Sequence, residues 1–543
     1  MRHNTLWLMQ TKIKLPIIPE EEMTPTVKAL LDVTSQCINI IDLQAKEIQK
    51  LRDEIARLKG NKPKPKIRPS RMDNDLNKKK NENNNSNRKK KGSRKRKKKL
   101  DVDKIEIIQP ENIPEGSKFI DYTDYYVQDI IFQKNITNYR RARWRTPAGE
   151  WIIGKLPKTV EGHFGKSLER YILYLNYGLN VTQHMIHEGF LDIGFDISKG
   201  KINEILIKDK SSFHKEKELL LTTGLEISPY VVTDDTGARH DGKNGYCNHI
   251  GNEYFAYFTS TNSKSRINFL KILRNKHTDY ILNMDALNYM FLSKLSESKI
   301  KRLENISQKG KKFENDEEWN EFLKMVGIRE KNHIRIVTEA ALVASIFSHG
   351  FNKNMVILSD EAGQFNVFLH ALCWIHAERK IDRLIPINDY EKKIITNIQT
   401  QLWTLYDNLK KYKKNPFIED QVKINNEFDR IFTQKTEFDT INKALSAIFN
   451  IKKELLFVLK RPEIPLTNNI SENDIRVFAT KRKIHGGTRS IEGRYCRDTF
   501  LSLNKTCRKL GVLFFEFLYD RITHENNISL LSELMKQKAL EES

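Results

Sequence analysis

Two short apolar runs that each end in an acidic residue constrain this chain of 543 residues most strongly. The first is "YVVTDD", which ends in Asp234 and Asp235, and the second is "MVILSD", which ends in Asp360. Apolar runs this short and continuous are typical of strands buried on both faces, at the centre of a sheet covered by helices. If the two strands are parallel neighbours, their carboxyl ends place Asp234 and Asp360 side by side at one sheet edge. The sequence therefore predicts an α/β fold with acids gathered where ligands bind.

A third acid, Glu472, lies in "NNISENDIR", a segment typical of the start of a helix. We expect Ser471 to cap this helix with Asp474 as its third residue, which puts Glu472 in the first turn, where the helix dipole favours the ionised carboxylate. Arg476, four residues later, shares the face of Glu472 and could hold that carboxylate or a substrate phosphate. The alternative for Glu472 is an ordinary first-turn glutamate, and for Asp360 it is a cap at a strand end.

Carboxylates held close together repel each other unless a cation lies between them. Mg²⁺ or Mn²⁺ suits such a set of oxygen ligands, and three acids can hold two ions, an arrangement suited to in-line attack on a phosphodiester. Cys373 and His376 in "CWIHAERK" lack a second ligand pair, so we expect a packed helix there rather than a metal site.

The net charge of +23 is concentrated in one tract. Residues 61–99 contain 18 basic and 3 acidic residues, and their composition predicts a disordered linker that contacts phosphates without sequence preference. A solubilising segment and a nuclear-targeting signal are the alternatives. Ahead of it, residues 30–58 have apolar residues at heptad spacing, which indicates a coiled-coil helix or an amphipathic helix docked on its own domain.

Between the linker and the first acidic run, "NYRRARWRTPAGEWIIGKLP" predicts two strands joined by a tight turn. Three short helices are expected next, with Ser198 capping the third. A helix-turn-helix of this kind could place its last helix in a DNA groove, although the same pattern occurs in helical domains that bind nothing.

No apolar run approaches the roughly 20 residues that span a bilayer, and the start of the chain has too short an apolar core for a secretory signal. The five cysteines are scattered, without a C-x-x-C pair. We therefore expect a cytoplasmic protein without disulfides and without a membrane partner.

With these residues in view, the chain resembles transposases of the insertion-sequence-66 family, of the DDE class with an RNase H-like catalytic core. The resemblance rests on "DDTG" at 234–237, "SDEAGQF" at 359–365, "ALCWIHAERK" at 371–380 and "RPEIPLTNNISENDIR" at 461–476. It implies that Asp234, Asp360 and Glu472 are the catalytic triad and metal ligands, although Asp235 stays an alternative to Asp234. It also implies DNA as substrate, with phosphate contacts from Arg379, Lys380, Arg476, Lys481, Arg482, Lys483 and Arg489.

The family resemblance implies metal-dependent cleavage at the 3′ ends of the element, followed by transfer of those ends to target DNA. The alternatives are an RNase H-like nuclease that only hydrolyses, and an inactive DNA-binding remnant. Relatives often carry a cysteine-based zinc module, which has no counterpart here, so no zinc is expected. We expect a bacterial, nucleoid-associated protein that forms a homodimer or higher oligomer on DNA, with accessory proteins as candidate partners.

Five regions are predicted along the chain. They are an N-terminal helix (1–60), the basic linker (61–100), a mixed β and helix-turn-helix region (101–225), the catalytic core (226–490) with helical insertions at about 265–350 and 382–460, and C-terminal helices (491–543).

Overall fold

The computed structural model describes residues 24–30, 32–34, 36, 104–110, 112, 114–115, 117–129, 134–157, 160 and 162–542. The chain divides into two compact units, Val33–Gln133 and a larger unit of Met1–Asp32 with Lys134–Ser543. In the first unit, the described residues from 104 onward form neither helix nor strand. The predicted heptad seam beyond residue 36 and the whole basic linker lie outside the described residues.

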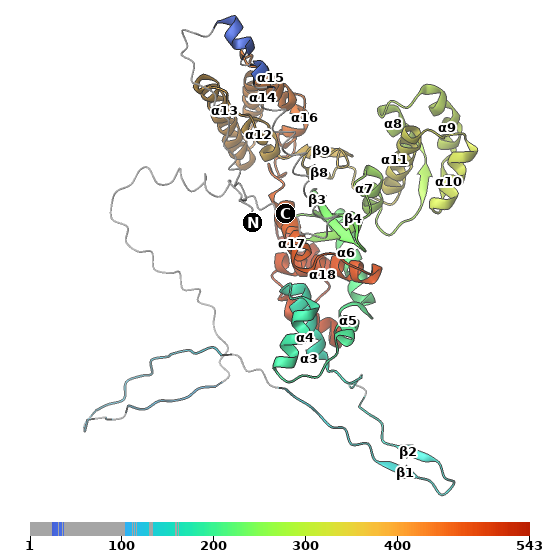
Figure 1. The fold of residues 1–543 in the computed structure, drawn as a ribbon, viewed down its shortest axis with the longest axis vertical. Coiled ribbons are helices and arrows are strands. Elements are labelled where there is room, and N and C mark those ends of the chain that lie inside the picture. Colours follow the sequence, from blue (N-terminus) through green and yellow to red (C-terminus); the bar gives the residue numbers. More distant parts are fainter. Residues whose placement is uncertain are drawn as a thin grey trace, which may run out of the picture. The chain divides into compact units, whose positions relative to one another are not determined.

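A mixed five-stranded sheet organises the larger unit (Figure 1). Its strands, in spatial order, are β5 (Ala256–Thr261), β4 (Lys243–Gly251), β3 (Tyr230–His240), β8 (Val356–Ser359) and β9 (Leu369–Leu372). The strands β3, β4 and β5 pair antiparallel, whereas β3–β8 and β8–β9 are parallel. The predicted α/β fold is confirmed, and β3 and β8 are parallel neighbours, which is the condition for bringing Asp234 and Asp360 together.

The two central parallel strands are buried on both faces, as their apolar runs predict. Val231 and Ile357 pack into the large core on one face, while Val232 and Leu358 pack into a separate cluster on the other. All four side chains are wholly buried. Because successive side chains in a strand point to opposite faces, only an uninterrupted apolar run can fill both clusters.

The strand β4 was not predicted, and β3 is longer than predicted. The segment "DGKNG" at 241–245 favours a turn by its composition, but it supplies only the two turn residues Asp241 and Gly242, which have positive φ of 45° and 70°. This two-residue Asp-Gly turn suits a tight hairpin, so the residues on both sides continue as paired strands. Asp234 therefore lies inside β3, just beyond its parallel pairing with β8, rather than at the end of the strand.

Four helices end the chain, and the first two cover the sheet. They are α17 (Asn469–His485), α18 (Ile491–Leu510), α19 (Phe514–Thr523), which packs on α3 (Lys166–Leu173) and α18, and α20 (Leu531–Glu542), which packs on α6 (Ser211–Ile227) and α18. The helix α17 packs against β3 and β4, and α18 packs against β5 (Figure 1). Phe478 and Leu501, both wholly buried, bring these two helices into one apolar cluster with β4 and β5.

Two helical segments lie in the parts of the chain where helical insertions are predicted, the first between β5 and β8 and the second between β9 and α17. The first contains α7 (Arg266–Leu273), β6 (Tyr280–Leu282), α8 (Met284–Leu292), α9 (Glu297–Lys309), β7 (Lys311–Phe313), α10 (Asp316–Met325) and α11 (Lys331–Ser348). The second contains α12 (Trp374–Asp382), α13 (Asp389–Lys414), α14 (Ile418–Phe432), α15 (Asp439–Phe449) and α16 (Lys452–Leu455), which share a core of their own.

The segment before the sheet contains the predicted hairpin, β1 (Arg143–Arg145) and β2 (Trp151–Ile153), and the three predicted short helices, α3 (Lys166–Leu173), α4 (Gln183–Asp192) and α5 (Lys199–Ile207). A fourth helix, α6 (Ser211–Ile227), was not predicted. Ser198 caps α5, as predicted, by accepting a hydrogen bond from the backbone of Lys201. Placement of α5 in a DNA groove stays a prediction. Among the described residues, no helix is both long and apolar enough to cross a membrane.

The packing around two helical glycines predicts that replacing each by alanine has opposite effects on the free energy of unfolding. A Cβ on Gly224 would lie only 2.4 Å from the buried ring of Phe255, whereas a Cβ on Gly189 in α4 has nothing within 4 Å. We expect Gly224→Ala to lower the free energy of unfolding by about 1–3 kcal/mol through overpacking. Gly189→Ala should raise it by about 0.5–1 kcal/mol, because alanine restricts the unfolded chain more than glycine. Urea unfolding of both variants tests this packing, and equal effects of the two would contradict it.

Candidate active site

Asp234 lies in an electrostatic environment that disfavours its charged form. One carboxylate oxygen accepts a hydrogen bond from the backbone N–H of Asp235, at 2.7 Å. Burial raises the pKa of Asp234 to about 7, against the lowering effect of that hydrogen bond, and the charges of Asp360, Asp235 and Glu472 raise it further. The structure thus brings the three predicted acids close enough to influence one another.

Asp360 directly follows β8, as the apolar run predicts. Its Oδ1 accepts a hydrogen bond from the backbone N–H of Ala362, at 3.1 Å, which turns the chain sharply after the strand. The same loop is held from the other side by Arg266, which donates to the carbonyl of Gly363 at 2.6 Å. A short, hydrogen-bonded turn therefore fixes the second acid at the end of a central strand.

Glu472 lies in the first turn of α17, as predicted. The predicted capping box is wrong, because the helix begins at Asn469 and Ser471 is inside it. Oγ of Ser471 instead contacts Nδ1 of the buried His249, at 2.6 Å. Asp474 is also turned inward, with its carboxylate 3.1 Å from Nε2 of His249. The residues flanking Glu472 anchor the helix to β4 rather than cap it.

Lysines from α18 complete the anchor of α17. The ammonium groups of Lys505 and Lys509 lie 3.2 and 2.8 Å from the Asp474 carboxylate. Burial alone would raise the pKa of Asp474, but His249 and Lys509 hold it well below its usual range. A charged carboxylate that is only 4% exposed is stable here because three neighbouring groups compensate for its lost hydration.

Two residues of α12 contact Glu472, and the sequence interpretation assigned neither of them to the site of the acids. Nε2 of His376 and Nη2 of Arg379 lie 3.8 and 3.9 Å from the Glu472 carboxylate. The pKa of His376 is lowered overall, because burial and Arg379 lower it by more than Glu472 and Asp360 raise it. Arg379 therefore faces a predicted catalytic acid, and Lys380 pairs with Glu361 at 2.6 Å. The sequence feature that could have pointed to this contact is the position of His376 within the "CWIHAERK" motif.

The adjacent acids Asp234 and Asp235 have different surroundings. Oδ1 of Asp235 lies 2.8 Å from the ammonium of Lys264, and its Oδ2 accepts a hydrogen bond from Gln364 at 2.6 Å. Burial lowers the pKa of Lys264, but the hydrogen bond to Asp235 and the charges of the nearby aspartates outweigh this and raise it. Asp235 already has a partner for each oxygen, which distinguishes it from Asp234.

The remaining predicted phosphate contacts divide into exposed and buried residues. Arg476, Lys483 and Arg489 are exposed, and Arg482 extends over Gly237 of β3, where an added Cβ would lie 3.1 Å from the guanidinium. Lys481 is only 3% exposed. Its ammonium donates to the backbone carbonyl of Asn176 at 2.6 Å. The prediction that Lys481 grips a DNA phosphate is therefore wrong in this structure, because its charge is used inside the protein.

A second group of ligand-type side chains lies away from the acids. His277, Asp279 and His349 offer atoms that all lie within 4.8 Å of one another, the one such group of three among the described residues. Asp279 accepts hydrogen bonds from Ser345 and His349 at 2.9 Å, and the ring of His277 stacks on that of His349. These contacts account for the group as a hydrogen-bonded junction between β6 and α11.

Comparison with known proteins gives a family for the residues around two of the acids. Residues 349–495, which include Asp360 and Glu472 but not Asp234, match the family described as "Transposase IS66 family". The chain is also 39% identical over 323 residues to "Uncharacterized protein y4jO" of Sinorhizobium fredii (strain NBRC 101917 / NGR234). That alignment covers 59% of this chain and 100% of the relative. No solved structure matches the chain.

The fold and site define an α/β protein with a cluster of acids at the centre of its sheet. The chain belongs to the IS66 family of transposases, which confirms the resemblance predicted from its motifs.

Burial of Lys481 predicts a pH-dependent contribution to stability. Burial, with a smaller effect of Arg497, lowers the pKa of Lys481 to about 7. Between pH 7 and 10 the unfolded chain would keep a proton that the folded chain releases, so stability should rise with pH across this window by about 1 kcal/mol per unit from this group. Lys481→Met should remove that slope, whereas Lys483→Met, at an exposed position, should leave it unchanged. Urea unfolding at several pH values would contradict the assignment if both variants kept the wild-type slope.

Proposed function

We propose that this protein is a DNA transposase that cleaves the 3′ ends of an insertion sequence and joins them to target DNA, with Asp234, Asp360 and Glu472 as its catalytic acids. One observation carries the proposal. Three acids that are far apart in the sequence converge so closely that Asp360 and Glu472 both raise the pKa of Asp234. A carboxylate whose pKa is raised by burial and by neighbouring acids, on a central strand of an α/β sheet, is a candidate for a functional site.

An RNase H-like catalytic core is part of the proposal. Its support is the strand order β5-β4-β3-β8-β9, in which three antiparallel strands are followed by two parallel ones. The first acid lies in β3, the second directly follows the adjacent strand β8, and the third lies on α17, which packs across β3 and β4. The acids thus belong to rigid elements, as a site that must align reacting groups requires.

The donor set fits two divalent cations. Asp234, Asp360 and Glu472 provide only oxygen ligands, as Mg²⁺ and Mn²⁺ prefer, and a cation would offset the repulsion that raises the pKa of Asp234. Bound there, the ions would activate the attacking hydroxyl and stabilise the leaving oxygen. The protein's own groups orient the acids: Lys264 and Gln364 hold Asp235, and with it the backbone of the first acid.

His376 and Arg379 are proposed to position Glu472. Each lies within 4 Å of its carboxylate, and the guanidinium of Arg379 places a positive charge beside the third acid. Arg379 also donates to His376 at 2.9 Å, which fixes the orientation of the imidazole ring. The exposed cations Arg476, Lys483 and Arg489 follow Glu472 in the chain and are proposed to contact phosphates beside the scissile bond.

Two alternatives use the same fold. A nuclease that only hydrolyses would need the acids but no second strand-transfer step, and an inactive remnant would need only the basic residues. The intact acids, each held in place by its own hydrogen bonds or ion pairs, favour an active enzyme. Pairing of two subunits through residues 30–58 and a need for accessory proteins are parts of the proposal that rest on sequence alone.

Purified protein incubated with labelled DNA that carries the element's terminal repeats tests the proposal directly. In Mg²⁺ or Mn²⁺, cleavage with a joined product supports a transposase, cleavage alone supports the nuclease, and binding alone supports the remnant. Asp360→Ala should reduce cleavage by about 10³-fold, equivalent to about 4 kcal/mol, and leave DNA binding intact. Normal cleavage by this variant would show that the acids are wrongly assigned.

The different surroundings of the two adjacent aspartates predict different outcomes for isosteric variants. Asp234→Asn should abolish cleavage, since it removes a charged oxygen that faces the other two acids. Asp235→Asn should keep cleavage within about tenfold and lower the free energy of unfolding by about 1–2 kcal/mol, because Lys264 loses its partner. Cleavage assays and thermal unfolding of both variants test this. The reverse pattern would make Asp235 the first catalytic acid.

A further inference from the structure

The hairpin of β1 and β2 carries arginines and tryptophans for which the proposed function has no role. Residues 140–155 contain five basic residues and one acidic residue, Glu150. All six strand residues are exposed, so neither face of the hairpin is buried by another described part of the chain. A two-stranded hairpin that stands alone in water is marginally stable at best, so this one would be stabilised by a partner.

The hairpin nevertheless has a defined turn and register. Gly149, with a positive φ of 88°, donates its N–H to the carbonyl of Thr146 at 2.9 Å, and the hydroxyl of Thr146 accepts from the N–H of Glu150 at 3.0 Å. Below this turn, Trp144 pairs with Ile152. Because successive side chains of a strand point to opposite faces, this register separates Trp144 and Ile152 from their neighbours in the two strands.

One face of the hairpin presents two arginines on a tryptophan ring. Arg143 and Arg145 lie two residues apart in β1, so their side chains share a face, on which Trp151 pairs with Arg145. Their guanidinium carbons lie 4.6 and 5.9 Å from the centroid of the Trp151 ring, within the range of a cation–π contact. The ring therefore orders both guanidinium groups and leaves their N–H donors available to an anionic partner.

Trp144 and Ile152 form the opposite face, and both are uncovered. Trp144 is 71% exposed and Ile152 is 58% exposed. Aromatic rings combined with arginines are typical of surfaces that bind nucleic acids, since the rings pack on bases while the cations contact the backbone. A partner that only covered apolar surface would leave the arginines of the first face without a role, so the charge of the hairpin favours a polyanion.

We propose that the hairpin β1–β2 is a DNA-binding ribbon that enters the major groove of the duplex turn first. The major groove admits a two-stranded ribbon. In this orientation Arg143 and Arg145 face one phosphate backbone, and Trp144 and Ile152 pack on the opposite wall of the groove. The rise of the strand separates the two arginines by about 6.5 Å, comparable to the distance between successive phosphates of one DNA strand, so each arginine has its own phosphate.

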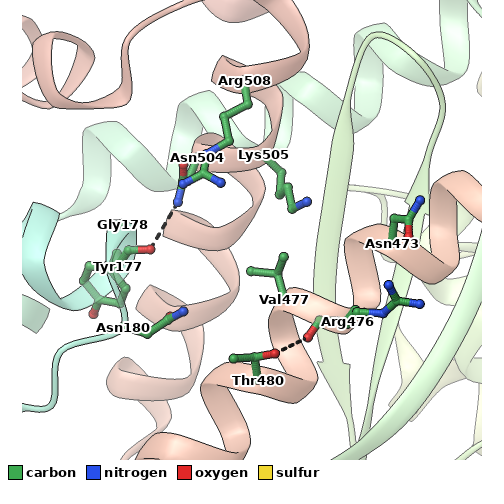
Figure 2. A pocket seen from close by; sticks show the side chains of 10 residues that line it. All are labelled: Tyr177, Gly178, Asn180, Asn473, Arg476, Val477, Thr480, Asn504, Lys505 and Arg508. Carbon is green, nitrogen blue, oxygen red and sulfur yellow. Dashed lines mark hydrogen bonds between the residues drawn. The ribbon is translucent and has the colours of Figure 1, made fainter. Parts of the chain in front are cut away.

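The helix that follows the hairpin is fastened to the helix of the third acid. The end of α3 continues into a π-helical turn (Tyr174–Gly178), whose backbone carbonyls need partners. Lys481 of α17 donates to the carbonyl of Asn176, and Asn504 of α18 donates to that of Tyr177 at 3.2 Å (Figure 2). DNA bound by the hairpin is therefore connected through α3 to the elements that surround the acids.

Binding of the full-length protein to a short fluorescent DNA duplex, without divalent ions so that nothing is cleaved, tests the arginine contacts. Arg143→Gln and Arg145→Gln should each weaken binding several-fold and reduce the slope of log affinity against log salt by about 1, because each removes one phosphate contact. Arg329→Gln removes the same charge from an exposed position outside the hairpin and should change neither. Wild-type affinity and slope in both hairpin variants would overturn the proposal.

Photo-crosslinking identifies what lies against the other face. The full-length variant Trp144→p-benzoylphenylalanine should form an adduct with the labelled duplex on irradiation. The same replacement of Phe291, which is 72% exposed in α8, is the matched control and should form no DNA adduct. Absence of a DNA adduct at position 144, or an adduct there with a second protein chain in its place, would overturn the proposal.

The inference rests on the proposed function for DNA as the partner, but its tests are independent of the catalytic assignment. If Asp360→Ala cleaved DNA normally while the hairpin variants lost affinity, the proposed acids would fail and the hairpin would stand. If Asp360→Ala lost cleavage while the hairpin variants bound DNA as the wild type does, the acids would stand and the hairpin would fail.

Discussion

The contact between His249 and the first turn of α17 determines where the third acid lies. His249 is wholly buried and pairs with Asp234 across the β3–β4 ladder. Its two ring nitrogens contact Ser471 and Asp474, which lie on the buried side of the turn that carries Glu472. The pKa of His249 is lowered overall, because burial lowers it by more than Asp474 raises it. The strand pair that carries the first acid therefore also holds the helix that carries the third, and replacing either partner would leave a buried polar group unsatisfied.

This arrangement explains how a helical insertion can separate the second and third acids in sequence without separating them in space. The insertion has a core of its own, and its two ends are joined, since the backbone N–H of Trp374 donates to the carbonyl of Leu466 at 3.0 Å. The indole of Trp374 also donates to the carbonyl of Leu455 inside the insertion. Because the chain leaves and returns at neighbouring points, the position of α17 depends on its own contacts with β3 and β4 and not on the length of the insertion.

The sequence predicted what depends on local pattern and missed what depends on tertiary partners. Apolar runs of four residues were enough to predict β8 and the place of Asp360 after it, and the polar start of α17 was enough to place Glu472 in its first turn. Ser471 was misread as a cap, because only the fold brings His249 to it. Lys481 was misread as a phosphate contact, because its sequence neighbours are exposed cations and its partner, a carbonyl of the π-helical turn, lies more than 300 residues away.

The two faces of α17 connect these observations. Asp474, Phe478 and Lys481 recur at helical spacing and face inward, where they are held by α18, the sheet and the π-helical turn respectively. Glu472 and Arg476, one turn apart, lie on the accessible face. Each buried contact therefore fixes the rotation of the helix about its axis, and that rotation leaves the Glu472 carboxylate close enough to raise the pKa of Asp234. A single rigid helix thus holds the third acid beside the sheet, which is the preorganisation that a site with a fixed ligand geometry requires.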